Sequence, residues 1–156
     1  MRKSRTINKR PKLPDPIYHS VLVEQLIKQV MRKGKKNLAQ AIVYQALNLI
    51  EKKSKTNKIE VLNLAIENIK PKLEVRSRKV GGAKYQIPIQ VKKERQIALA
   101  LRWLVEAAKK RTEKEFISKL AEEILAASNK AGSAMKKRNT IHKTADANKA
   151  FAYYSW

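Results

Sequence analysis

The stretch from residue 72 to residue 91 limits the fold most, because only here do residues alternate with the period of a β-strand. Two alternating runs flank Gly81 and Gly82, and paired glycines supply the positive φ angles that a hairpin turn requires. Pro88 cannot donate to a β-ladder, which favours a projecting ribbon over a central strand. The sequence therefore predicts a β-hairpin at about 73–91 that projects from the rest of the domain.

The register of this hairpin depends on the length of its loop. A two-residue loop would mix apolar and charged side chains on one face, namely Glu74, Arg76, Arg78, Tyr85, Ile87 and Ile89. A three-residue loop would instead gather an apolar face of Leu73, Val75, Tyr85, Ile87 and Ile89. The opposite face would then carry Arg76, Arg78, Lys84 and Gln86. Because a one-residue slip turns every side chain to the other face, we prefer the three-residue loop or a bulge with the same effect.

The segments on either side of the hairpin have the apolar spacing of helices. The predicted helices span about 20–33, 35–53, 58–70, 93–111, 113–128 and 134–153. We therefore expect a mainly α fold, with six helices and the hairpin between the third and fourth. A basic tail at 1–12 precedes this single domain at 13–156. The length suits one domain with a real core better than two.

Several residues mark the expected helix ends. Gly34 is placed as the C-terminal cap of the first helix, and Pro71 ends the third. The expected helix starts are Asn57 with Glu60, Thr112 with Glu115, and Ser133. The inward stripe expected for the second helix is Leu38, Ile42, Ala46, Leu49 and Ile50.

The charge of the chain indicates the class of its partner. Lys and Arg number 36 against 13 Asp and Glu, which gives a net charge of +23. Such an excess repels itself and calls for a polyanion, and nucleic acid fits better than a membrane surface. No apolar stretch approaches the roughly 20 residues of a membrane span, and no signal peptide is recognised. A soluble, intracellular protein is expected, and the lack of cysteine excludes disulfides and thiolate metal sites.

Cations cluster where they oppose helix dipoles, at expected helix N-termini. These clusters contain Lys35, Lys36, Lys92, Lys93, Lys136, Lys137 and Arg138. A phosphate docked on the helix amides would explain them, although the abundance of lysine offers coincidence as the alternative. The basic tail contributes Arg2, Lys3, Arg5 and Arg10, which we expect to order on RNA rather than only to solubilise. The remaining RNA-binding candidates outside the hairpin are Arg32, Arg95, Arg102 and Lys143.

The acids are gathered in one window at the end of the fourth helix and along the fifth. They are Glu106, Glu113, Glu115, Glu122 and Glu123. We expect this side to face solvent or a protein, with RNA on the opposite side. Charge reversal at Glu122 and Glu123 is then expected to leave RNA affinity unchanged or raised.

The sequence offers no candidate for catalysis. His19 and His142 are far apart, and neither has a spaced partner for a metal site. No phosphate-binding glycine loop or nucleophile motif is present, so we expect neither an enzyme nor a cofactor. Asp15 is expected to cap a turn, and packing explains Trp103 as well as base stacking does.

Four stretches in order carry a resemblance to a known family. They are Pro14-Asp-Pro-Ile-Tyr18, the hairpin segment 75–89, the segment 100–108, and Ala145-Asp-Ala-Asn-Lys-Ala-Phe-Ala-Tyr-Tyr154. Together they resemble the universal small-subunit ribosomal protein number seven of bacterial type, essentially end to end. This resemblance implies a primary binder of small-subunit rRNA that nucleates assembly of the 3′ major domain, the subunit head. It also implies a place in the ribosome, cytoplasmic or organellar, beside neighbouring proteins of the head and platform.

The resemblance also assigns roles to residues. It implies that the hairpin lies near the exit-site tRNA and the mRNA. The RNA contacts that it implies are Lys35, Lys36, Arg76, Arg78, Lys79, Lys136, Lys137, Arg138, His142 and Asn148. The chain departs from the family pattern at five positions. Asn139 and Thr140 stand where acids are usual, and Lys143, Lys149 and Ser155 stand where arginines are usual. Lysine retains the charge of arginine but loses its bidentate fork.

A DNA-binding architectural protein is the alternative from another class. It would also be basic and helical, but no clear recognition helix or dimer heptad supports it.

Overall fold

The computed structural model describes residue 11 and residues 13–155, and confirms a mainly α fold. The helices in this part of the chain are α1 (Val21–Val30), α2 (Lys36–Ser54), α3 (Lys58–Ile69), α4 (Lys93–Lys109), α5 (Phe116–Ser128) and α6 (Ser133–Ala147). The antiparallel strands β1 (Leu73–Val80) and β2 (Ala83–Gln90) lie between α3 and α4, as predicted. A 3₁₀ helix, η1 (Lys149–Ser155), follows α6. Within these residues, no helix is both long and apolar enough to cross a membrane.

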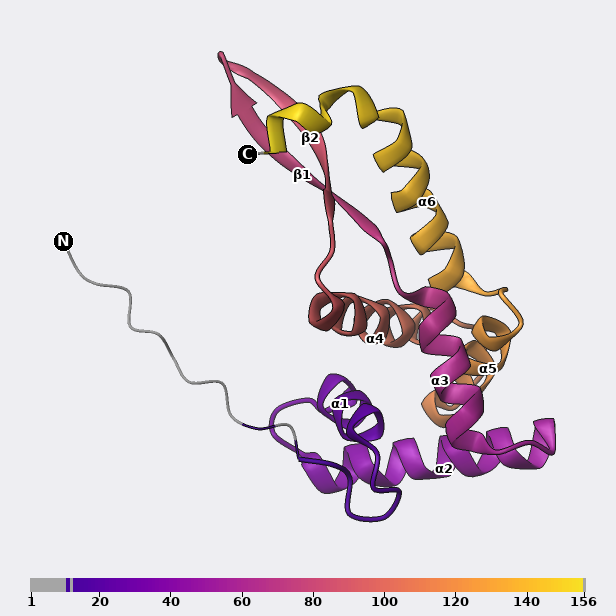
Figure 1. Ribbon diagram of the computed structural model, residues 1–156. Coiled ribbons are helices and arrows are strands. Elements are labelled where there is room, and N and C mark those ends of the chain that lie inside the picture. The colour runs from indigo at the N-terminus through magenta and orange to yellow at the C-terminus, as the bar shows by residue number, and fades with distance from the viewer. Residues whose placement is uncertain (1–10, 12, 156) are drawn as a thin grey trace.

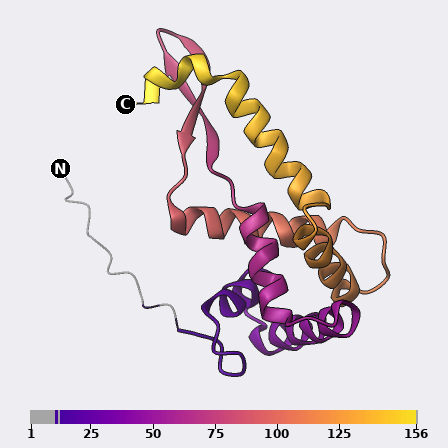
Figure 2. The same cartoon turned by 45° about the vertical axis from the view of Figure 1, so that its right-hand side comes forward.

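The hairpin projects from the helical body and is accompanied by α6 (Figure 1). In both views α4 lies at the base of the hairpin, and α2 lies at the far end of the molecule (Figures 1 and 2). The chain then folds back, so that η1 lies against β2, with the ring centres of Tyr85 and Phe151 5.1 Å apart. A two-stranded ribbon is marginal alone in water, so α6 and η1 supply the support that this ribbon requires.

The core lies among the first five helices. Its largest fully buried apolar side chains there are Leu26, Ile27, Leu47, Ile50, Leu62, Ile66, Ile69, Leu104, Leu120 and Ile124. Leu38 was predicted to point inward but is 57% exposed. The buried stripe of α2 instead follows Ala39, Val43, Ala46, Leu47 and Ile50. Near its start, α2 is therefore rotated by one position relative to the prediction, which turns Leu38 outward.

The preferred register of the hairpin was wrong. Val80 pairs with Ala83, so the loop contains only Gly81 and Gly82. Both glycines have positive φ angles, 57° and 89°, as a two-residue type I′ turn requires. Arg78 is therefore opposite Tyr85, and the mixed face predicted for the two-residue loop is the one that forms. The strands do not need to gather their apolar side chains on one face, because η1 covers the mixed face at Tyr85.

The helix ends agree only partly with the prediction. Asn57 caps α3, its side chain accepting a hydrogen bond from the Ile59 amide at 3.0 Å, and α3 stops at Ile69 before Pro71. Three other predicted ends were wrong. Gly34 does not cap α1, because this helix already ends at Val30 and Gly34 lies in the turn that follows. Thr112 does not cap α5, which starts at Phe116. Ser133 is the first residue of α6, and Gly132 is in the capping position before it. Likewise α6 ends at Ala147, before the 3₁₀ helix.

A buried carboxylate fixes the segment that leads into α1. Asp15 is 0% exposed and accepts hydrogen bonds from the amides of Ile17 at 3.2 Å and Tyr18 at 3.0 Å. Its other oxygen accepts from the Tyr44 hydroxyl at 2.6 Å, which joins the segment to α2. The predicted turn cap is therefore confirmed, with a tertiary contact added.

Replacing Tyr44 with phenylalanine is expected to lower the free energy of unfolding by about 2 kcal/mol at neutral pH, because the buried Asp15 loses a hydrogen bond. Burial, with help from Asp15, raises the pKa of Tyr44 from 10.0 to about 12. This contribution to stability is complete below pH 10 and is lost as pH rises toward 12. The wild type should therefore lose more stability than Tyr44→Phe across that interval.

Urea titrations from pH 7 to pH 12 measure this difference. The matched control is Tyr18→Phe, because the Tyr18 hydroxyl lies 3.5 Å from Asn48 in an exposed contact and does not donate to the buried Asp15 carboxylate. Equal losses for both variants at neutral pH would contradict the role given to Tyr44.

Candidate nucleic-acid interface

Two lysines face each other near the tip of the hairpin. Lys79 on β1 is paired directly with Lys84 on β2, and both side chains are exposed. Like charges directly across two strands repel and destabilise the pair. An anion between them would remove the repulsion. The three-residue loop predicted that Lys84 shares a face with Arg76 and Arg78. This prediction was wrong, because the observed register places Lys84 on the opposite face.

At the base of the hairpin, one carboxylate holds two arginines. Glu74 accepts from Arg76 Nη2 at 2.8 Å and from Arg95 Nε at 2.7 Å, so it connects β1 to the first turn of α4. The Glu74 side chain is only 12% exposed, whereas those of Arg76 and Arg95 are 58% and 51% exposed. The ion pairs fix both guanidinium groups, while much of each remains open to solvent.

The connection between α1 and α2 separates its cations into two kinds. Lys36 Nζ lies 3.2 Å from Glu24, whose side chain is 7% exposed, and Lys28 lies 3.4 Å from the same carboxylate. Arg32 and Lys35 are exposed, and the described residues supply no ion-pair partner for either. Lys36 therefore helps to hold the two helices together, whereas Arg32 and Lys35 face outward.

The cations near the start of α6 are similarly divided. Arg138 Nη1 donates to the Asn68 carbonyl at 2.7 Å and so ties α6 to the end of α3. Lys137 pairs with Glu106 at 2.7 Å and lies 5.7 Å from the ring centre of Trp103. Trp103 itself is 5% exposed, so of the two explanations left open by the sequence, packing fits better than base stacking. Lys136 is exposed.

The amide end of α6 is already occupied by a carboxylate. Glu123 is 0% exposed; it accepts from the Ala134 amide at 2.9 Å and pairs with Arg111 at 2.7 Å. A phosphate on these helix amides would have to displace it. The expectation that Glu123 belongs to an acidic face toward solvent or a protein was therefore wrong, because this acid caps α6 from inside the core. Glu122, its neighbour, forms a surface ion pair with Lys53.

Two of the predicted C-terminal site residues make internal contacts. Asn148 donates to the Thr144 carbonyl at 2.8 Å. His142 Nε2 accepts from the Lys72 amide at 3.1 Å, which fixes α6 beside the start of β1. Burial lowers the pKa of His142 below its usual 6.5, and the positive charges of Arg138 and Lys72 lower it further against the opposing effect of Asp146.

The lowered pKa of His142 predicts a stability loss in mild acid. Folding favours the neutral form of His142. The contribution of this histidine to the free energy of unfolding is therefore complete above pH 6.5 and is lost as pH falls below that value. His142→Gln can still accept from Lys72 but does not titrate, so its stability should change less between pH 7 and pH 5. Thermal melting across this range measures the difference, with the exposed His19→Gln as control. Parallel curves for wild type and His142→Gln would contradict the assignment.

Several predicted cations are exposed and have no ion-pair partner in the part of the chain that the structure describes. They are Arg32, Lys35, Lys79, Lys84, Lys92, Arg102, Lys136 and Lys143. They come from the α1–α2 connection, the hairpin, α4 with the residue that precedes it, and α6. Arg78 is exposed on the face of Tyr85. The predicted tail residues Arg2, Lys3, Arg5 and Arg10 lie outside the described residues.

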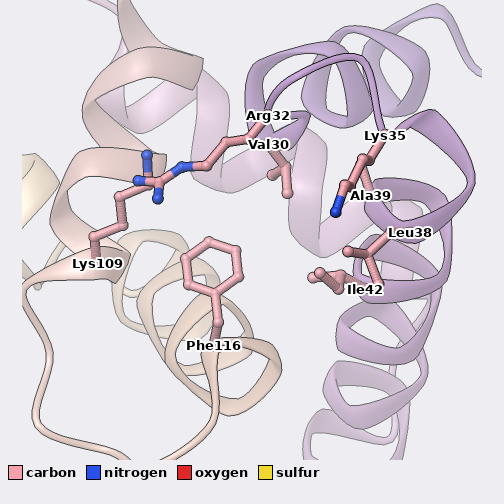
Figure 3. A pocket seen from close by; sticks show the side chains of 8 residues that line it. All are labelled: Val30, Arg32, Lys35, Leu38, Ala39, Ile42, Lys109 and Phe116. Atoms are coloured by element: carbon pink, nitrogen blue, oxygen red, sulfur yellow. The ribbon is translucent and has the colours of Figure 1, made fainter.

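Sequence reasoning missed two residues beside Arg32 and Lys35. Lys109, at the end of α4, and Phe116, at the start of α5, line the same pocket as these two cations (Figure 3). In the sequence they fall within the acidic window, so only the tertiary packing shows that they adjoin a basic loop. The one available signal in the sequence was the position of Lys109 in the last turn of an expected helix. The helix dipole already explains a cation there, so this position does not indicate a binding site.

A helical domain with a braced hairpin and exposed, unneutralised cations on several elements defines a basic nucleic-acid-binding protein. The family model described as "Ribosomal protein S7p/S5e" matches residues 1–149. The chain belongs to this family. As a member it is a ribosomal protein of the small subunit that binds rRNA, and it is not an enzyme. Its place is the ribosome, and this membership replaces the alternative of a DNA-binding architectural protein.

Relatives from several bacteria match nearly the whole chain. The small ribosomal subunit protein uS7 of Mycoplasma mycoides subsp. mycoides is 54% identical over 156 residues, which is 100% of both chains. The protein of the same name from Thermotoga petrophila is 54% identical over 143 residues, 92% of each chain. That of Mycolicibacterium gilvum is 53% identical over 148 residues, 95% of each.

Proposed function

We propose that this chain is a primary binder of small-subunit rRNA, which nucleates assembly of the 3′ major domain in the subunit head. The observation that carries the proposal is the pairing of Lys79 with Lys84 near the tip of a projecting hairpin. Both lysines are exposed, and within the described residues neither has an ion-pair partner that would offset the repulsion. Phosphate groups from a structured RNA would convert the repulsion into attraction.

Counterion release supplies the driving force. Lysine and arginine neutralise phosphates where RNA helices meet, and the released cations favour a compact junction. If about eight phosphates are engaged, the logarithm of the affinity falls by several units for each unit in the logarithm of the salt concentration. Recognition then depends on RNA shape more than on base sequence.

The hairpin is the element that reaches farthest from the helical body (Figure 1). Its two faces both carry cations, with Arg76 and Arg78 on one and Lys79 and Lys84 on the other. A ribbon charged on both faces can contact rRNA on one side and a second RNA on the other. We place this end near the exit-site tRNA and the path of the mRNA, with other proteins of the head and platform as neighbours.

Chemical footprinting on small-subunit rRNA tests the proposal. The purified chain is expected to protect the 3′ major domain when added alone, before any other protein, and to do so less strongly as salt increases. Reconstitution of subunits without the chain should leave the head unfolded. Binding that is insensitive to salt, or normal heads without the chain, would overturn the proposal.

A further inference from the structure

A pocket of about 310 Å³ lies where the α1–α2 connection meets the end of α4 and the start of α5. Its apolar lining comes from Val30, Leu38, Ala39, Ile42 and Phe116. Figure 3 shows the side chain of Arg32 extending toward Lys109 above the Phe116 ring, with Lys35 and Leu38 on the opposite side. The pocket therefore has an aromatic wall and three cations around its opening.

Two features of this pocket are unfavourable in the free protein. Leu38 leaves 57% of its surface exposed at the opening. Arg32, Lys35 and Lys109 surround an apolar hollow, and no described acid forms an ion pair with any of them. One ligand with a flat apolar face and negative charge beside it would relieve both the exposed apolar surface and the repulsion between cations.

We propose that this pocket receives one unstacked nucleobase of the bound RNA. The base lies against the Phe116 ring, and its flanking phosphates contact Arg32, Lys35 and Lys109. Splayed bases of single-stranded RNA segments commonly stack on aromatic side chains in this way. The inference rests on the proposed function, because it specifies how the rRNA is held at one part of the same interface.

The dimensions and charges favour a nucleotide over an acidic peptide. A single nucleotide has both an aromatic face and a phosphate on each side, so it matches a hollow with cations on more than one edge. The volume of about 310 Å³ is at the small end of the range for ligand sites, which suits one base. Arg32 and Lys35 also belong to the exposed cations of the interface, so RNA bound there passes the opening.

The test uses the full chain and a transcript of the small-subunit 3′ major domain. Phe116→Leu retains apolar volume but removes the ring, and Lys109→Gln removes one cation from the opening. Each has a matched neighbour outside this pocket, Ile117→Leu and Lys110→Gln. Filter binding gives the affinity, base-specific chemical probing gives the protected nucleotides, and thermal melting confirms that every variant is folded.

Phe116→Leu is expected to weaken binding by roughly tenfold. Phe116→Leu and Lys109→Gln should expose the same unpaired base to the probe while the rest of the footprint persists. The neighbouring controls should leave that base protected. Unchanged protection in both folded pocket variants, with the wild type bound, would overturn the pocket inference alone. Failure of the wild type to bind the transcript would instead remove the proposed function, and this inference with it.

An acidic peptide as the occupant has a different signature. In that case both pocket variants would bind the transcript normally but would fail to recruit another ribosomal protein in reconstituted subunits. This outcome would also overturn the assignment of a nucleobase.

Discussion

Glu123→Ala is expected to lower the free energy of unfolding by about 2–4 kcal/mol, the cost of losing charge-assisted hydrogen bonds to the Ala134 amide and to the partly exposed Arg111. Glu123 is 0% exposed, and its two oxygens bind Arg111 at 2.7 Å and the Ala134 amide at 2.9 Å. The substitution leaves the start of α6 without its carboxylate partner, and Glu113 is then the remaining described ion-pair partner of Arg111. Because total stabilities of such domains are about 5–15 kcal/mol, the variant should be marginally folded.

Denaturant titration measures this loss, and the adjacent Glu122→Ala is the control. Among the described residues Glu122 forms a surface pair with Lys53, so removing it should cost at most about 1 kcal/mol. Glu123→Gln should fall between wild type and Glu123→Ala, because an amide oxygen can still accept from Ala134. Similar stabilities for the Glu122 and Glu123 variants would show that Glu123 does not bind α6 to the core in solution.

Replacing both Lys79 and Lys84 with glutamine is expected to weaken rRNA binding by roughly tenfold or more and to reduce the log–log salt slope by about two. Each lysine is exposed, and each is assigned a phosphate contact by the proposed function. The same change removes the repulsion between directly paired lysines, so the folded protein should not become less stable. The affinity for rRNA is thus expected to fall while the free energy of unfolding does not. This difference distinguishes the loss of RNA contacts from damage to the fold.

Binding series at several salt concentrations, combined with thermal melts, measure both quantities. The control replaces Lys52 and Lys114 with glutamine, which removes the same charge from exposed positions outside the predicted interface. An equal loss of affinity in the control would mean that net charge, rather than the hairpin, governs binding. An unchanged salt slope in the hairpin variant would remove Lys79 and Lys84 from the interface.

The sequence predicted the elements of the fold well because their signals are local. Apolar spacing located all six helices, and Asn57 and Pro71 marked two ends of helices correctly. The paired glycines located the hairpin turn, since few other residues tolerate two consecutive positive φ angles. These features depend on neighbours within a few positions, so no knowledge of distant packing was required.

The apolar pattern of the two strands was a misleading guide to the register of the hairpin. Sorting apolar side chains onto one face assumed that this face alone would be covered. In the structure η1 covers Tyr85 through Phe151, and α6 lies along β1, so partners from the end of the chain settle how the strands pack. The turn geometry at Gly81 and Gly82 was the better guide, because it fixes loop length directly.

The candidate site shows the same limit. Charge alone could not separate exposed cations from those with internal roles, and Arg138 and His142 have contacts with residues about 70 positions away. The sequence predicted Glu123 to be a surface acid, whereas in the structure it is buried and accepts a hydrogen bond from the first turn of α6. The proximity of Lys109 to Arg32 likewise depends on how α4 packs beside the α1–α2 connection. Such pairings arise from tertiary structure, which a local pattern does not contain.

The contact between Tyr85 and Phe151 has a consequence for biosynthesis. Translation proceeds from the N-terminus, so both strands leave the exit tunnel well before η1 has been made. During that interval the nascent hairpin has neither α6 nor η1 beside it and remains marginal. The ribbon gains its full support only when α6 and the segment around residue 151 have both emerged, and a chain cut short before α6 would carry its cations on a poorly supported hairpin.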